Sequence, residues 1–149
     1  MAKATTPVPQ GLHSVTTQLV LSDAMRAIDF YKKAFSAEVG GVMHGPDGKS
    51  VMHGHVRIGD SVVFLSDVVG FAKPTTANLF LYVADVDTTV ARAIESGAKA
   101  LAPVADMFWG DRWGMIEDPF GNVWQVATHI EDVSPDEMKK RARAMAPKP

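Results

Sequence analysis

The fold is decided by Ile58-Gly59-Asp60-Ser61-Val62-Val63-Phe64-Leu65, a glycine turn that runs into a strand, and by its near repeat, Phe120-Gly121-Asn122-Val123-Trp124-Gln125-Val126-Ala127. The two glycines are 62 residues apart. The same separation relates Leu19-Val20-Leu21-Ser22-Asp23 to Leu81-Tyr82-Val83-Ala84-Asp85. The repeat predicts two copies of one structural unit. Two such copies can bury a face against each other and can enclose a site that draws on matching positions of both.

The first copy has the pattern strand–helix–strand–strand–strand. Val15 to Leu21 alternates between apolar and polar residues, which predicts a strand. Asp23 to Phe35 carries apolar residues at helical spacing, with Ser22 or Asp23 available as the cap. Two further strands, Glu38 to His44 and Val51 to Ile58, flank the turn sequence Gly45-Pro46-Asp47-Gly48 and predict a hairpin. Ser61 to Leu65 is the last strand.

The second copy repeats this order. Asn78 to Val83 predicts a strand, and Asp87 is expected to cap a helix that ends at Gly97. The three later strands are expected at Lys99 to Val104, Trp113 to Glu117 and Asn122 to Thr128. The run Ser134-Pro135-Asp136-Glu137 has the form of a capping box and predicts a short C-terminal helix.

These patterns predict an α+β chain with tandem βαβββ modules. We expect a disordered N-terminus at residues 1–12, a first module at 13–67 and a linker at 68–77. A second module at 78–130 is followed by a C-terminal helix and tail at 131–149.

Composition limits the classes of function. Of the 149 residues, 46% are hydrophobic, which is enough for a packed core. The net charge of −2 gives no electrostatic case for a nucleic-acid or membrane partner, and the absence of cysteine excludes thiolate metal sites and cysteine nucleophiles. No signal-peptide pattern and no apolar run of about 20 residues is seen, so we expect a cytoplasmic protein.

Several motifs together resemble a known family. The doubled strand order, the helix Ile28-Asp29-Phe30-Tyr31-Lys32-Lys33-Ala34-Phe35 and the turn Asp118-Pro119-Phe120-Gly121-Asn122-Val123-Trp124 are similar to the vicinal oxygen chelate superfamily, which holds glyoxalases, bleomycin-resistance proteins and extradiol dioxygenases. Four further segments resemble the PhnB-like branch of this superfamily. They are Arg57-Ile58-Gly59-Asp60-Ser61, Leu65-Ser66-Asp67, Trp109-Gly110-Asp111-Arg112 and Thr128-His129-Ile130-Glu131-Asp132-Val133-Ser134. The resemblance implies curled mixed sheets around a cavity, and a homodimer.

Metal-dependent members of that superfamily take one His or Glu ligand from the first and last strand of each module. The resemblance carries these positions to Thr16, Val63, Asn78 and Gln125. Val63 has no donor atom, and the other three are neutral, so they differ from the imidazole and carboxylate ligands of a tight metal site. We therefore expect no cofactor, while a divalent metal held elsewhere stays open.

His53 and His55 are the candidates for chemistry elsewhere. They share one face of a strand with Arg57, and the 62-residue shift brings Met115 and Glu117 to the matching places of the second module. The set His53, His55 and Glu117 has three interpretations: polar residues lining a strand face, an acid/base or substrate-contacting group, or a set of metal ligands. If a reaction is catalysed, these are the expected catalytic residues.

The remaining cavity lining is predicted from the alternation of the strands and from the loop that precedes Trp113. It is mostly apolar and aromatic with a few polar groups, which is typical of a small-molecule pocket. Val63 and Leu65 are also predicted to face the cavity, and Trp124 is predicted to lie in the core. Arg112 is predicted either to pair with Asp111 or to anchor an anion. The expected pocket residues are Thr16, Gln18, Asn78, Phe80, Tyr82, Trp109, Arg112, Trp113, Met115 and Gln125.

The leading hypothesis is a homodimer that binds a small planar or aromatic molecule without a catalytic metal, as the drug-binding members of the superfamily do by stacking. One alternative is an enzyme of the lyase, isomerase or dioxygenase type that acts on a small oxygenated substrate. Another is a structural or regulatory dimer with no ligand.

Overall fold

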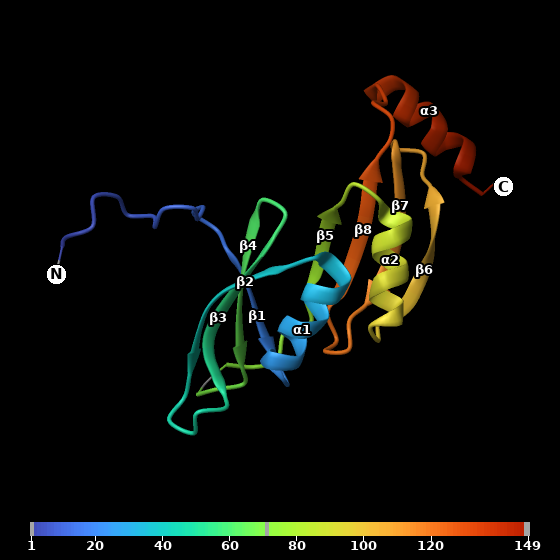
Figure 1. Cartoon of the computed structure of the whole chain (residues 1–149). Coiled ribbons are helices and arrows are strands. Elements are labelled where there is room, and N and C mark those ends of the chain that lie inside the picture. Colours follow the sequence, from blue (N-terminus) through green and yellow to red (C-terminus); the bar gives the residue numbers. More distant parts are fainter. Residues whose placement is uncertain (1, 71, 148–149) are drawn as a thin grey trace. The chain divides into compact units, whose positions relative to one another are not determined.

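The computed structural model describes residues 2–70 and 72–147, in two compact units, Met1–Thr75 and Thr76–Pro149. Each unit holds one four-stranded mixed sheet (Figure 1). The predicted α+β class, with tandem βαβββ modules and a short C-terminal helix, is confirmed. Within the described residues, no helix has the length and apolar character needed to cross a membrane.

The first unit has the strand order β1-β4-β3-β2. β1 runs parallel to β4, and the other neighbours are antiparallel. This arrangement follows from the crossover that α1 makes between β1 and the hairpin. The elements are β1 (Thr17–Leu21), α1 (Ala24–Phe35), β2 (Glu38–His44), β3 (Val51–Ile58) and β4 (Ser61–Asp67).

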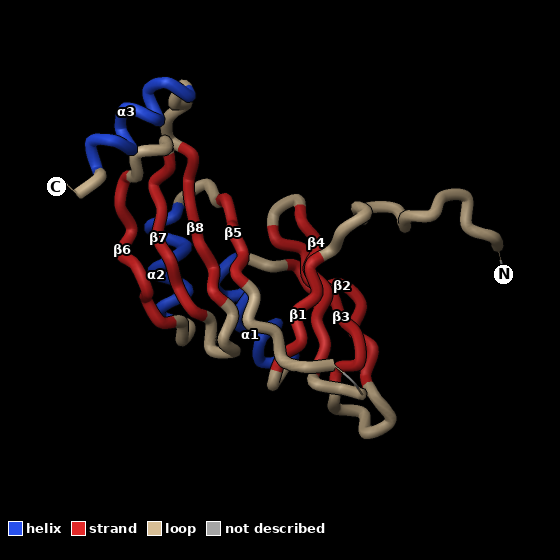
Figure 2. Tube along the Cα trace, turned by 180° about the vertical axis from the view of Figure 1, so that it is seen from behind, coloured by secondary structure: helices blue, strands red, loops and turns tan. Residues whose placement is uncertain are grey.

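The second unit repeats this topology with the strand order β5-β8-β7-β6, in which β5 runs parallel to β8. Figure 2 shows the four strands side by side with α2 behind them, on one face of the sheet. The last helix, α3, lies beyond the ends of the strands (Figures 1 and 2). The elements are β5 (Asn78–Tyr82), α2 (Val86–Glu95), β6 (Lys99–Asp106), β7 (Asp111–Glu117), β8 (Val123–His129) and α3 (Pro135–Met145).

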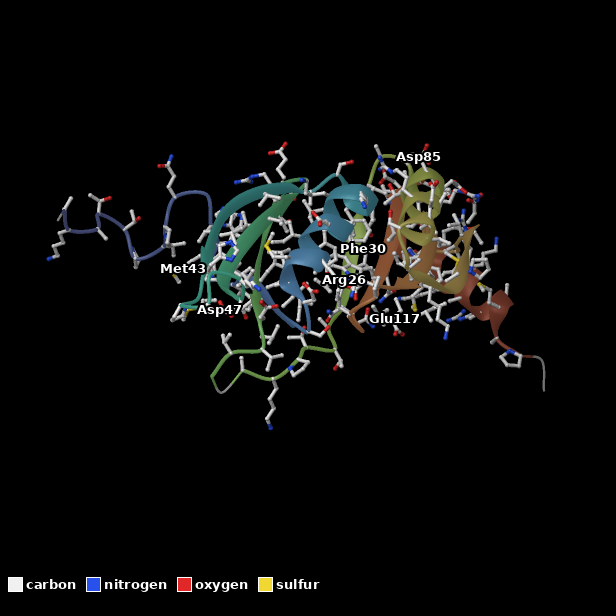
Figure 3. The ribbon with its side chains drawn as sticks, turned by 60° about the horizontal axis from the view of Figure 1, so that its bottom comes forward. Arg26, Phe30, Met43, Asp47, Asp85 and Glu117 are labelled. Atoms are coloured by element: carbon white, nitrogen blue, oxygen red, sulfur yellow. The ribbon has the colours of Figure 1, made fainter. Side chains whose placement is uncertain are left out.

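Both sheet-covering helices begin at an aspartate that follows the first strand of its unit. The carboxylate of Asp23 accepts a hydrogen bond from the Arg26 amide at 3.1 Å, and that of Asp85 accepts one from the Thr88 amide at 3.1 Å. Each bond satisfies an amide that the helix itself leaves unpaired. The predicted cap at Asp87 is therefore wrong, since Asp87 lies in the first turn of α2. Figure 3 labels Asp85 at this end of the second unit and Glu117, the last residue of β7, at the other.

The core of the first unit lies between α1 and the sheet. Tyr31 is fully buried and stacks on Phe35, with ring centroids 6.0 Å apart. From the sheet, Leu19 and Leu65 are also fully buried. Burial of such a side chain stabilises the fold by about 1.5–3 kcal/mol, so this layer holds the helix on one face of the sheet. The other face is free of helices of its own unit and is called the open face below.

An irregularity in the hairpin changes which residues of β3 face the helix. The pairing of β2 and β3 shifts between Val39 and Val42 and again between Met43 and His44. As a result Val51 is fully buried and Met52 is 45% exposed, so the start of β3 departs from the alternation that the rest of the strand follows. Asp47, in the turn of this hairpin, is labelled near Met43 in Figure 3.

Candidate functional site

The open face of the second sheet is rich in aromatic side chains. Strand register places Phe80 beside Gln125, and Met115 on the other side of Gln125, so all three share this face. The Phe80 and Tyr82 side chains are 46% and 59% exposed, with ring centroids 5.1 Å apart. Trp109 and Trp113 are half-buried, and their rings meet edge to face at 6.0 Å. These four rings, Phe80, Tyr82, Trp109 and Trp113, form what we call the aromatic face.

A buried carboxylate holds two of these rings in place. Asp111 is 1% exposed, and its Oδ2 accepts hydrogen bonds from the Tyr82 hydroxyl at 2.9 Å and from the Trp109 indole N–H at 2.9 Å. Its Oδ1 lies 2.8 Å from Nδ1 of His129, whose Nε2 lies 2.8 Å from a carboxylate oxygen of Asp132. A buried carboxylate that makes these bonds restricts the orientation of each donor.

The same contacts shift the pKa values of this network. Burial acts to raise the pKa of Asp111, but the hydrogen bonds from His129, Tyr82 and Trp109 outweigh it and hold that pKa below its usual value. The hydrogen bond to Asp132, followed by the one to Asp111, raises the pKa of His129. The bond to Asp111 raises the pKa of the Tyr82 phenol, which favours the protonated ring.

A second hydrogen-bonded chain crosses the middle of this face. The Trp113 indole N–H donates to Oε1 of Gln125 at 3.2 Å, and Nε2 of Gln125 donates to Oδ1 of Asn78 at 3.0 Å. Trp113, Gln125 and Asn78 are thus held by one another across three strands. The structure brings together the predicted pocket residues Asn78, Tyr82, Trp113 and Gln125, and it also places Phe80, Trp109 and Met115 on this face.

The open face of the first sheet is more polar. Register places His55 opposite Phe64 and Arg57 opposite Val62, and His53 lies on the same side of β3. The ring of His53 meets Phe64 edge to face, with centroids 4.8 Å apart. Gln18 pairs with Phe64, and Thr16 lines a small hollow at the start of β1. Glu117, the third member of the predicted catalytic set, belongs to the second unit.

Val63 and Leu65 do not lie on the open face, which corrects the prediction. They are 6% and 0% exposed and point toward α1. Phe64 pairs with Gln18 and Gln125 pairs with Phe80, so Phe64 is the counterpart of Gln125, at a separation of 61 residues rather than 62. Thr17 pairs with Val63, 46 residues on, whereas Asn78 pairs with Val123, 45 residues on, so the stretch from β1 to β4 is one residue longer than the stretch from β5 to β8. A one-residue slip moves every side chain of a strand to the other face.

Arg112 lies on the helix side of β7, between its neighbours Asp111 and Trp113. Its Nε and Nη2 donate to the two carboxylate oxygens of Asp87 at 2.7 and 2.9 Å, and its Nη1 donates to Asp106 at 2.9 Å. The predicted pair with Asp111 is therefore wrong. All three nitrogens of this guanidinium are already bonded to carboxylates of the same unit.

Comparison with known proteins places this geometry in a family. The family model described as the Glyoxalase/Bleomycin resistance protein/Dioxygenase superfamily matches residues 11–126. The chain belongs to this superfamily. Among its relatives is an uncharacterized protein of Mycobacterium bovis, Mb0911c, which is 38% identical over 137 residues, or 85% of this chain and 90% of the relative.

Several solved structures show the same fold. TnmS3, an antibiotic binding protein from Streptomyces sp. CB03234, is 26% identical with a TM-score of 0.62, and the match covers 79% of this chain and 96% of TnmS3. TioX from Micromonospora sp. ML1 is 23% identical with a TM-score of 0.66, and the match covers 78% of this chain and 98% of TioX. A PhnB protein from Bacillus cereus also matches, with 19% identity and a TM-score of 0.63.

The four positions that correspond to metal ligands in metal-dependent members of the superfamily carry poor metal ligands in this chain. In the second unit these positions are Asn78 and Gln125, whose amide oxygens already accept hydrogen bonds from Gln125 and Trp113. In the first unit, Val63 is buried in the core and Phe64 replaces it on the open face, and neither has a donor atom. This donor set does not fit the imidazole and carboxylate ligands of a zinc or iron site. Across residues 2–70 and 72–147, no cluster of three or more His, Cys, Asp or Glu side chains is arranged to hold a metal ion.

The Asp111–His129–Asp132 network was not predicted from the sequence, where Asp111 was considered only as a partner of Arg112. The available signal was the resemblance of both segments, Trp109 to Arg112 and Thr128 to Ser134, to the PhnB-like branch. β7 and β8 bring the two segments together, because Asp111 and His129 are register partners.

Proposed function

We propose that the protein binds a planar aromatic small molecule by stacking on the aromatic face of the second unit, without a catalytic metal. The observation that carries the proposal is the pair of exposed rings, Phe80 and Tyr82, next to the half-buried indoles of Trp109 and Trp113. Tyr82 and Trp109 share Asp111 as acceptor, so their rings are oriented before a ligand arrives. A preformed site loses less conformational entropy on binding.

The chemistry of this face favours an uncharged, flat ligand. The rings supply π surfaces, and the amides of Asn78 and Gln125 supply a few polar groups at one side. A mostly apolar surface with few polar groups is typical of ligand sites. Membership of the superfamily supports the proposal, as does the likeness to TnmS3, an antibiotic binding protein.

Tryptophan fluorescence and thermal unfolding test this proposal with a panel of anthraquinones, phenazines and quinoxalines, and with adamantanol as the saturated control. A ligand at 100 times its Kd stabilises the folded state by about 2.7 kcal/mol, which raises the unfolding midpoint. We expect at least one planar compound to quench the fluorescence and raise the midpoint, and adamantanol to do neither. If no planar compound does so, the proposal is wrong.

Single substitutions test whether the ligand binds on the aromatic face. Each stacked aromatic pair contributes about 0.5–1.5 kcal/mol, so Phe80→Ala and Tyr82→Ala should each weaken binding by about 2- to 12-fold. Ile94→Ala removes an apolar side chain, 44% exposed, from α2 on the other face of the sheet and should leave binding unchanged. If all three variants bind the ligand with the same affinity, the ligand does not bind on the aromatic face.

A further inference from the structure

The open face of the first unit has a hollow of its own, with a different chemistry. Its volume is about 320 Å³, and its walls include Leu12, His53, His55, Arg57, Val62 and Phe64. All of these residues belong to the first unit, Met1–Thr75. A volume of this size is at the lower end of the range of ligand pockets.

One wall of the hollow is a row of nitrogen donors. His53, His55 and Arg57 alternate along β3, and alternate residues on a strand lie about 6.6 Å apart. A neutral imidazole has one N–H to donate, and a guanidinium has five. The row therefore presents donors and positive charge to the same space.

Arg57 is the informative member of this row. In the part of the chain that the structure describes, its guanidinium makes no hydrogen bond and no ion pair. Arg112 and Arg141, by contrast, are each bonded to two carboxylates. Glu38 is the register partner of Arg57 on β2, but the two side chains do not pair within 4.0 Å. Arg57 is thus free to bind an external anion.

The other side chains of the hollow are mostly apolar, with Gln10 as a further polar one. Val62 and Phe64 come from β4, and Leu12 comes from the segment before β1. Phe64 also supports the His53 ring, with centroids 4.8 Å apart. The imidazole of His55 lies over Gly40, where a Cβ atom would overlap the ring. Gly40 therefore leaves room for His55 at the edge of the hollow.

We propose that this hollow binds an anionic group carried on an apolar body, a carboxylate or a phosphate ester, with Arg57 as the main anchor and His53 and His55 as additional donors. A guanidinium binds either anion with two parallel hydrogen bonds, and Val62, Phe64 and Leu12 contact the apolar part. This site lies on a different unit from the aromatic face and does not depend on the function proposed there.

Titrations of the full chain followed by NMR test the proposal. The probes are benzoate and phenyl phosphate, with benzamide as the neutral counterpart of benzoate and inorganic phosphate as the anion without an apolar body. We expect benzoate, phenyl phosphate or both to shift the signals of the Arg57 Nε–H and of the His53 and His55 rings. Benzamide and inorganic phosphate should bind at least 10-fold more weakly than the corresponding anionic aryl probe. The stronger of the two aryl probes identifies the anion.

Three variants give the matched controls. Arg57→Gln should weaken the better probe at least 10-fold, while Glu38→Gln removes the nearby carboxylate and should tighten binding about 2- to 4-fold by removing charge repulsion. Arg92→Gln changes the net charge equally on an exposed site of α2 and should have no effect. Arg57 is exposed, so its variant is expected to fold, and its amide spectrum verifies this.

The proposal is overturned if neither aryl anion binds, if benzamide binds as well as benzoate, or if Arg57→Gln and Arg92→Gln have the same affinity. If inorganic phosphate binds as tightly as phenyl phosphate, the proposed contact between the apolar body and the walls of the hollow is wrong.

Discussion

Asp111 and His129 face each other as register partners on β7 and β8, with Oδ1 of the carboxylate 2.8 Å from Nδ1 of the imidazole. The other ring nitrogen of His129 lies 2.8 Å from Asp132. Carboxylates only accept hydrogen bonds, so both contacts are satisfied together when the ring carries both protons. This relationship ties the end of the sheet to the segment that leads into α3.

The stability of the fold should depend on pH through His129. The hydrogen bonds to Asp132 and Asp111 raise the pKa of His129 above the ordinary value of 6.5. A raised pKa in the folded state means that the protonated ring stabilises the fold fully below pH 6.5, and that this contribution is lost as the pH rises through the raised pKa. The urea midpoint should therefore fall across this range in the unmodified protein. It should fall less in His129→Gln, and equal slopes in both proteins would contradict the prediction.

The second prediction concerns Asp111 itself. In Asp111→Asn the amide can still accept from Tyr82 and Trp109, but the charge is lost and the contact to His129 is no longer an ion pair. Loss of such a buried bond costs about 1–3 kcal/mol, measured as the change in the free energy of unfolding in urea. The pKa of His129, followed by NMR, should also fall.

Asp132→Asn is the matched control for this second prediction, since Asp132 contacts the same ring from an exposed position. It should lower the pKa of His129 with little change in stability. A large loss of stability in Asp132→Asn, or none in Asp111→Asn, would contradict the account of the buried carboxylate.

The glycine between Trp109 and Asp111 leaves no space for a side chain. Gly110 has φ of +102°, and a Cβ atom there would overlap the carbonyl oxygen of Glu131. The Gly110 carbonyl in turn accepts hydrogen bonds from the amides of Ile130 and Glu131, so backbone surrounds it. Gly121 also has a positive φ, of +90°, but open space where its Cβ atom would be.

Alanine at either position lowers the free energy of unfolding, because its side chain is strained in the left-handed conformation. Only Gly110→Ala also forces two backbone segments apart. Overpacking of this kind costs about 1–3 kcal/mol, so Gly110→Ala should be less stable than Gly121→Ala by that amount in urea unfolding. Gly110→Ala should also change the tryptophan fluorescence, because Trp109 is the neighbour of Gly110 and moves with the loop. Equal stabilities of the two variants would show that the loop can move away.

Local periodicity was enough to predict the elements of this chain, because each amphipathic helix and each alternating strand carries its own signal. The face of β4 was predicted wrongly because the 62-residue repeat was applied to a stretch, from β1 to β4, that is one residue longer than its counterpart from β5 to β8. Phe64 therefore takes the place that was predicted for Val63. The same limit applies to β3, where irregular pairing with β2 buries Val51 rather than Met52.

The polar contacts of the site could not be predicted from spacing. Tyr82, Trp109 and His129 all bond to Asp111, yet Tyr82 is 29 positions away along the chain and His129 is 18. Strand register brings these residues together, and a sequence does not state register directly. Two members of the aromatic face were predictable, since strand alternation alone places Phe80 and Tyr82 on one face.

The two units hold the start of their helices with different side chains at matching places. In the first unit, Oδ1 of Asp67 accepts a hydrogen bond from the Ala24 amide at 2.7 Å and Oδ2 accepts one from the Val51 amide at 2.7 Å. In the second unit, Oγ1 of Thr128 accepts from the Val86 amide at 2.9 Å and donates to the Val83 carbonyl at 2.9 Å. Both residues lie on the last strand of their unit and satisfy an amide at the first position of the helix.

Asp67→Ala leaves two amides without an acceptor, whereas Asp67→Asn keeps one acceptor. Each unsatisfied amide costs about 1–3 kcal/mol, so Asp67→Ala should lose more stability than Asp67→Asn. Thr128→Val should lose stability, while Thr128→Ser, which retains the hydroxyl, should lose little. Amide hydrogen exchange gives a local readout: exchange at Ala24 and Val51 should speed up only in the Asp67 variants and exchange at Val86 only in Thr128→Val. If exchange at Ala24 and Val51 were unchanged in Asp67→Ala, these bonds would not be what secures α1 and β3 to β4.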